Sequence, residues 1–184
     1  MEVIENPVLN SPYKEPARHF RFSEEGITSE IVEDRRSSSY FVPIPKPKKK
    51  GAQLAFDTEW TQDRVEENAF INRVRFRVAR WRLNRYPGVT KTTRQLLDHW
   101  TDPERERKLF FCQIKALETA IYITEVANRS NDAWIQNTLK EVNATANPLL
   151  ERMALKMATG SGKTVVMAML ISWQALNKLG EVPE

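Results

Sequence analysis

The chain has 184 residues, of which 41% are hydrophobic and 28% are charged, a length that allows one globular domain with an additional arm. No apolar run reaches the ~18 residues of a membrane-spanning helix, and the first residues lack the pattern of a secretory signal, so we expect a cytoplasmic protein without a membrane partner. One cysteine and two histidines exclude an internal disulfide and a zinc site of spaced Cys and His ligands. The net charge of +4 allows a nucleic-acid partner without requiring one.

Residues 1–58 are predicted to form an N-terminal extension. The stretches "RHFRF", "SEEG" and "ITSEIVEDR" are typical of a strand, a tight turn and a second strand, with Gly26 in the turn. The following "FVPIPKPKKKG" contains prolines that exclude a helix and favour an extended linker. We interpret its lysines as solvated groups of a tether rather than as a nucleic-acid contact, because a lysine cluster reads no base sequence.

Residues 59–101 are predicted to form a helical segment. The stretch "TQDRVEENAFINRVRFRVARWRL" predicts a helix that begins at Thr61, with acidic residues in its first turns and arginines toward its C-terminal end. "YPGV" ends this helix, and Thr90 or Thr92 begins a short second helix. The arginines could face phosphates, but we expect the helices to pack by their apolar stripes with the arginine heads in water. The stripe of the first helix consists of Phe70, Val74, Val78 and Trp81.

Residues 102–184 begin with a second long helix in this prediction. "TDPERERKLFFCQIKALETAIYITEVA" places Asp102 as its N-cap and Pro103 at its first helical position, and Cys112 is expected to be a buried thiol. The polar "RSNDAWIQNTLKEVNATANP" predicts a short helix and a loop. After it, "ERMALKMA" predicts a strand, "TGSGKT" a Gly-rich loop, and "VVMAMLISWQALNKLG" a helix that ends at Gly180.

The Gly-rich loop has the composition of a phosphate-binding loop. Glycines at positions 160 and 162 let a phosphate approach the backbone where a side chain would block it, and the following helix N-terminus adds about half a positive charge. Lys163 can reach the β- and γ-phosphates as the catalytic lysine, and the Thr164 hydroxyl can bind Mg²⁺. The strict P-loop spacing would have a further glycine at position 157, which is Met157. The predicted phosphate-binding residues are Thr159, Gly160, Ser161, Gly162, Lys163 and Thr164.

Several stretches resemble one protein family. "MATGSGKT" resembles motif I of the second helicase superfamily, in which the first glycine is commonly replaced. "LFFCQIKALETA" resembles the helix ahead of motif I in which a glutamine contacts adenine. The run from "NPVLNSPYKEPARHFRF" through "TEWTQDRVEEN" to "LKMATGSGKTVVMAMLI" resembles the N-terminal part of the Res-type subunit of type III restriction endonucleases and their DEAD/DEAH relatives.

This resemblance implies an α/β fold, in which a helical N-terminal extension with a small β-hairpin precedes the first strand, P-loop and helix of a RecA-like domain. It also implies an ATP-dependent helicase or translocase activity with ATP and Mg²⁺ as cofactors. Gln113 would be the adenine-binding residue. The implied partners are double-stranded DNA and a modification methyltransferase subunit.

The chemistry of Gln113 fits that role. Its amide offers a donor and an acceptor, which can pair with N7 and N6 of adenine together, whereas guanine presents the acceptor O6 at the same edge. Phe110 or Phe111 could stack on the purine, or both could be core residues of an amphipathic helix.

Other residues that a nucleoside triphosphatase of this class needs do not follow the loop. No Asp-Glu pair after an apolar run and no arginine finger lies between Thr164 and Glu184, and "IVED" precedes the loop. We therefore expect the chain to be the front part of a longer enzyme and to be inactive alone. Two alternatives remain: a helical interaction module in residues 1–100 that docks a methyltransferase, and a P-loop ATPase unrelated to DNA.

Overall fold

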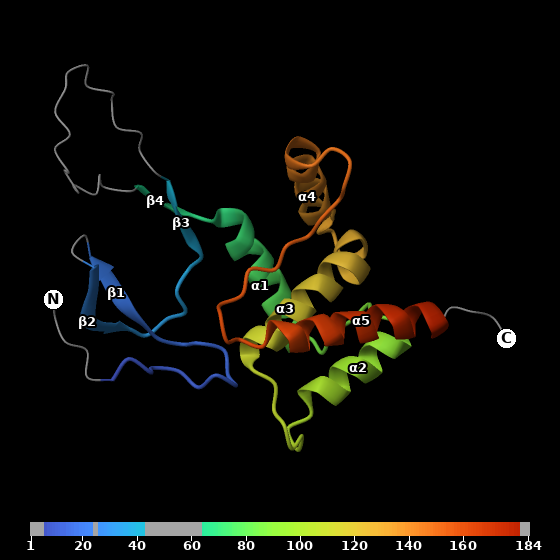
Figure 1. Cartoon of the computed structure of the whole chain (residues 1–184), viewed down its shortest axis with the longest axis horizontal. Coiled ribbons are helices and arrows are strands. Elements are labelled where there is room, and N and C mark those ends of the chain that lie inside the picture. The colour runs from blue at the N-terminus through green and yellow to red at the C-terminus, as the bar shows by residue number, and fades with distance from the viewer. Residues whose placement is uncertain (1–5, 24–25, 43–63, 181–184) are drawn as a thin grey trace.

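A computed structural model describes residues 6–23, 26–42 and 64–180 (Figure 1). This part of the chain contains two two-stranded antiparallel sheets and five α-helices, so the protein is mixed α and β. The predicted linker from Pro43 and the predicted helix start at Thr61 lie outside the described residues. Within the described ranges, no helix is both long enough and apolar enough to cross a membrane.

The predicted hairpin is confirmed. Strand β1 (His19–Ser23) pairs antiparallel with β2 (Gly26–Val32), and Ser23 lies opposite Gly26. Gly26 has a φ of 122°, a conformation that strains residues with a Cβ atom. A glycine is therefore needed where the second strand begins.

A second sheet, which was not predicted, precedes the first helix. Strand β3 (Ser39–Val42) pairs antiparallel with β4 (Arg64–Glu67). The prediction that residues 64–67 belong to a helix is therefore wrong, because pairing with a distant strand overrides the local helical pattern. Helix α1 (Ala69–Leu83) begins instead after Asn68, whose side-chain oxygen accepts a hydrogen bond from the N–H of Ile71 (3.3 Å).

Helix α3 (Phe111–Ile121) begins later than predicted. The expected N-cap Asp102 is instead the C-cap of the preceding helix, with φ −56° and ψ 120°, and does not start a helix. Two contacts fix the observed start: Gln113 Oε1 accepts the N–H of Phe110 (2.9 Å), and the carbonyl of Pro12 accepts the N–H of Phe111 (2.8 Å). The N-terminal arm thus satisfies a donor that the first turn of a helix leaves without an intrahelical partner.

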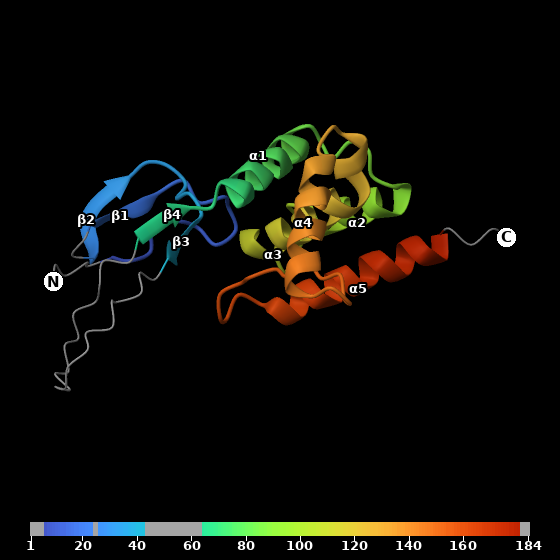
Figure 2. The same ribbon diagram turned by 90° about the horizontal axis from the view of Figure 1, so that it is seen from above.

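The other helices surround α3. Helix α2 (Lys91–Thr101) begins after Thr90 as predicted, and α3 continues into a π-helical turn η1 (Tyr122–Val126) and a short 3₁₀ helix η2 (Ala127–Arg129). The short helix predicted in the polar stretch is α4 (Ala133–Ala146), and α5 (Lys163–Gly180) reaches the last described residue. Figure 2 shows α1 and α5 on opposite sides of α3. The fully buried core side chains include Val78, Leu97, Leu117, Ile121 and Ile135.

Residues 151–158, predicted to form a strand, adopt no regular secondary structure. The strand prediction is wrong here because neither sheet of the described residues places a neighbouring strand beside this segment. The side-chain amide of Asn143 on α4 connects this segment to the helices. It accepts a hydrogen bond from the N–H of Arg152 (3.1 Å) and donates one to the carbonyl of Arg152 (2.7 Å). Helix α5 packs on α2 and α3 with Val166, Met169 and Trp173 buried.

Candidate functional site

The Gly-rich loop forms a tight turn that leads into α5. Gly160 and Gly162 both have a φ of 76°, so each adopts a left-handed conformation that glycine tolerates best. A Cβ at Gly160 would have no atom within 4 Å, which leaves open space beside the backbone. Helix α5 begins at Lys163, and the Gly162 carbonyl already accepts the N–H of Val165 (3.0 Å). The N–H groups of Lys163 and Thr164 precede any intrahelical acceptor. The loop therefore offers backbone donors next to free space, which suits an anion.

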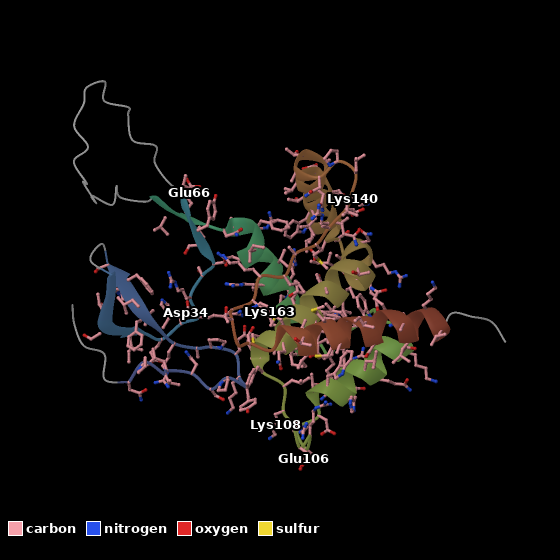
Figure 3. All side chains as sticks on the ribbon, in the orientation of Figure 1. Asp34, Glu66, Glu106, Lys108, Lys140 and Lys163 are labelled. Atoms are coloured by element: carbon pink, nitrogen blue, oxygen red, sulfur yellow. The ribbon has the colours of Figure 1, made fainter. Side chains whose placement is uncertain are left out.

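The polar side chains of the loop converge on one carbonyl oxygen. Lys163 Nζ donates to the carbonyl of Ala158 (3.0 Å), and Ser161 Oγ donates to the same oxygen (2.7 Å). Figure 3 shows Lys163 where the loop enters α5. The ammonium thus folds back toward the loop. Thr164 follows it in the first turn of α5 and is exposed, so its hydroxyl is open to a ligand.

Gln113 lies directly against the loop. Its Nε2 donates to the carbonyl of Ser161 (3.1 Å), its Oε1 accepts from Phe110, and the residue is only 5% exposed. An amide nitrogen carries two hydrogens and an amide oxygen accepts twice, so one donor and one acceptor remain. This remaining pair matches N7 and N6 of adenine. The structure thus brings together Gln113 and the loop, the two elements that sequence analysis assigned to one site.

Cys112 and the two neighbouring phenylalanines differ in their surroundings. Cys112 is exposed, which corrects the expectation of a buried thiol. The ring of Phe111 lies beneath two guanidinium groups, those of Arg82 (5.1 Å) and Arg35 (5.4 Å). The ring of Phe110 instead contacts Tyr13 of the N-terminal arm, with centroids 5.5 Å apart. Sequence analysis did not identify Tyr13, although it lies in the resembling stretch "NPVLNSPYKEPARHFRF".

A buried ionic network holds α1 against α3 behind the site. Arg82 donates to both carboxylate oxygens of Glu118, which is fully buried, and Tyr86 donates to the same carboxylate (2.7 Å). Arg82 also pairs with Glu15 (3.0 Å), which contacts Arg35 as well. Burial opposes ionisation of Glu15, but the two guanidinium groups outweigh it and lower its pKa below the usual value. The expectation that arginine heads lie in water is therefore wrong for Arg82, because a buried carboxylate recruits it.

Lys115 is the other buried cation of this region. Its Nζ donates to the carbonyl of Arg75 on α1 (3.3 Å). Burial and the nearby charge of Arg82 lower the pKa of Lys115 to about 8. A pocket of about 430 Å³ opens beside this network, and its lining includes Tyr13, Lys14, Phe111 and Glu118.

Comparisons of the chain with protein-family models, with curated proteins and with solved structures found no match.

Proposed function

We propose that the chain binds ATP with Mg²⁺ through the loop formed by residues 159–164. One observation carries the proposal: Gln113 donates a hydrogen bond to the Ser161 carbonyl, although the two residues are 48 positions apart. An adenine-reading amide and a phosphate-binding loop must lie within the length of one nucleotide. The contact meets that condition.

The residues of the loop fit a triphosphate. The N–H groups at the start of α5 would donate to phosphate oxygens, for which the open space beside Gly160 leaves room. Lys163 would exchange the Ala158 carbonyl for the β- and γ-phosphates. The Thr164 hydroxyl would complete the coordination of a phosphate-bound Mg²⁺, which neutralises charge on the phosphates. Gln113 would use its remaining donor and acceptor for the adenine edge.

We further propose that the chain is part of an ATP-dependent DNA translocase of the second helicase superfamily, similar to the Res-type subunit of type III restriction systems. The resemblance of the segments around Gln113 and Lys163 supports this wider proposal. Double-stranded DNA and a modification methyltransferase subunit would be its partners. ATP hydrolysis also needs an acidic strand end and an arginine finger, which would come from another part of the complete enzyme.

Nucleotide binding can be measured with the chain itself by titrating fluorescent ATP in the presence of Mg²⁺. Lys163→Ala removes charge-assisted hydrogen bonds of about 1.5–3 kcal/mol each, so we expect the affinity to fall at least about tenfold. Lys178→Ala is the matched control, because Lys178 is an exposed lysine in the last turn of the same helix. Its affinity should stay within about twofold of wild type.

Equal losses in the two variants would show that the ammonium at position 163 has no special role. Failure of the wild-type chain to bind at millimolar nucleotide would also refute the proposal for this loop. In the complete enzyme, Lys163→Ala should leave less than about a tenth of the ATP turnover, a loss of more than about 1.4 kcal/mol of transition-state stabilisation.

A further inference from the structure

Helix α1 has a buried side and a basic outer face. Its buried residues, Val74, Val78 and Trp81, form one stripe. Residues on the opposite side repeat at helical spacing and point away from that stripe. We call this set the outer face of α1, and it consists of the exposed residues Arg73, Phe76, Arg80 and Leu83. Phe76 is 61% exposed and Leu83 is 81% exposed, so the face is open to a partner.

The arginines of α1 have different neighbours on its two sides. On the side that faces α3, Arg82 is neutralised by the buried Glu118 and by Glu15. On the outer face, neither Arg73 nor Arg80 has a carboxylate partner among the described residues. Helix α1 itself contains no acidic residue. A positive charge without a counter-charge therefore remains on the outer face.

An aromatic ring lies beside each of these two outer guanidinium groups. Arg73 lies over the ring of Trp134 at 4.1 Å from its centroid, and Arg80 lies near the ring of Phe76 at 6.0 Å. A cation–π contact uses the flat face of the guanidinium and leaves the N–H edges available. Those edges match the oxygen pair of a phosphate. The side chains thus lose less conformational freedom when a phosphate binds.

A hollow of about 370 Å³ beside the outer face adds a further arginine. Arg77, Arg80 and Arg129 line it together with Asp132. Asp132 is only 2% exposed, and its carboxylate already accepts from Tyr122 (2.5 Å) and Trp134 (2.9 Å) and pairs with Arg77 (3.1 Å). Since that carboxylate already pairs with Arg77, the charges of Arg80 and Arg129 give the hollow a positive net charge.

We propose that the outer face of α1, together with Arg129, binds the phosphodiester backbone of duplex DNA. The choice of DNA among polyanions rests on the proposed function. Arg73 and Arg80 stand two helical turns apart, about 10 Å along the axis, so both guanidinium groups can contact phosphates of one duplex. A rigid helix with fixed guanidinium groups suits a regular array of phosphates. Phe76 lies between them and would pack on the sugars.

The DNA face and the nucleotide loop lie apart. Figure 2 shows α1 on the side of α3 opposite to α5, and the loop leads into α5. Substitutions in one site can therefore be made without touching the other. DNA binding and ATP binding become separate measurements.

The experiment measures fluorescence anisotropy of a labelled 25-base-pair duplex with the chain at several salt concentrations. The variant Arg73→Gln/Arg80→Gln/Arg129→Gln removes three charges, and Lys91→Gln/Lys108→Gln/Lys140→Gln removes three exposed charges elsewhere. Figure 3 shows Lys108 and Lys140 on separate elements. We expect the arginine variant to lose at least tenfold in affinity and its salt slope to flatten by about 2–3, since each phosphate contact contributes about 0.9. The lysine variant should stay within about twofold of wild type.

Further measurements distinguish a loss of binding from unfolding and distinguish duplex DNA from other polyanions. Arg80→Gln/Arg129→Gln leaves the Arg73–Trp134 contact intact and should flatten the slope by about 2 with an unchanged thermal midpoint. Equal losses of affinity in the arginine and lysine variants would show that only the net charge of the chain matters, which would overturn the proposal. Tighter binding of single-stranded DNA or of polyglutamate than of duplex would also overturn it. Lys163→Ala should bind duplex like wild type, so a failure of this inference is distinguishable from a failure of the nucleotide site.

Discussion

Replacing Gly162 by alanine adds one methyl group where the loop passes the amide of Gln113. The new Cβ would overlap Gln113 Nε2, and the backbone φ of +76° is itself unfavourable for alanine. Gly160 has the same φ of +76°, but nothing lies within 4 Å of its Cβ position. Both substitutions therefore introduce backbone strain, but only Gly162→Ala also introduces a clash. Comparing the two variants separates these effects.

The expected losses follow from these two effects. Alanine in a left-handed conformation costs about 1–2 kcal/mol, so Gly160→Ala should lower the free energy of unfolding by that amount. Gly162→Ala also displaces the amide of Gln113 from the Ser161 carbonyl and from the N–H of Phe110. Each hydrogen bond contributes about 0.5–1 kcal/mol, which brings the expected loss for Gly162→Ala to about 2–4 kcal/mol.

Urea unfolding can be followed by the fluorescence of buried tryptophans. Trp173 is 4% exposed on α5 and so reports on the helix that follows the loop. In a Gln113→Ala background the clashing amide is gone, and the loss caused by Gly162→Ala should fall to that of Gly160→Ala. The coupling free energy between Gly162→Ala and Gln113→Ala should be about 1–2 kcal/mol. Equal losses at the two glycines in the wild-type background, or additivity within about 0.5 kcal/mol, would refute the contact between loop and helix.

Two further predictions concern Gln113 and Lys115. Gln113→Ala should reduce the preference for ATP over GTP by about ten- to a hundredfold in competition binding, because two hydrogen bonds to the base are worth about 1–3 kcal/mol of discrimination. An unchanged ratio of the two affinities would make Gln113 a purely structural residue. Because burial and Arg82 lower the pKa of Lys115 from 10.5 to about 8, the unfolded chain holds a proton between these pH values that the folded chain has released. The free energy of unfolding should therefore rise with pH across that window, by at most roughly 3 kcal/mol, and urea unfolding of Lys115→Met should lack the rise.

Local signals in the sequence predicted the local features of the structure. The hairpin turn at Gly26 and the helix start at Thr90 depend on one residue and its immediate neighbours, so their chemistry can be read from a short stretch. The same holds for the loop glycines, whose positive φ is what their residue type favours. The sequence also indicated Gln113, but only through a resemblance and not through its periodicity.

Features that depend on distant residues could not be predicted. Strand β4 needs β3 as its partner, and no local pattern in "RVEE" indicates that pairing. The start of α3 depends on the carbonyl of Pro12, almost a hundred positions upstream. The half-buried position of Arg82 depends on Glu118, 36 positions downstream, whereas an arginine on an amphipathic helix is usually solvated.

Helix α3 connects the two proposed binding surfaces through contacts of unequal strength. Toward α1, the buried carboxylate of Glu118 accepts hydrogen bonds from Nε and Nη2 of Arg82, and removing one partner of such a pair costs about 3–5 kcal/mol. Toward the loop, Gln113 contributes a single neutral hydrogen bond to Ser161, worth about 1 kcal/mol. A chain of contacts cannot transmit more free energy than its weakest member supplies. Coupling between nucleotide in the loop and DNA on the outer face of α1 through this path is therefore bounded at about 1 kcal/mol, roughly fivefold in affinity. Any stronger coupling between the two sites has to run through contacts other than the one between Gln113 and Ser161.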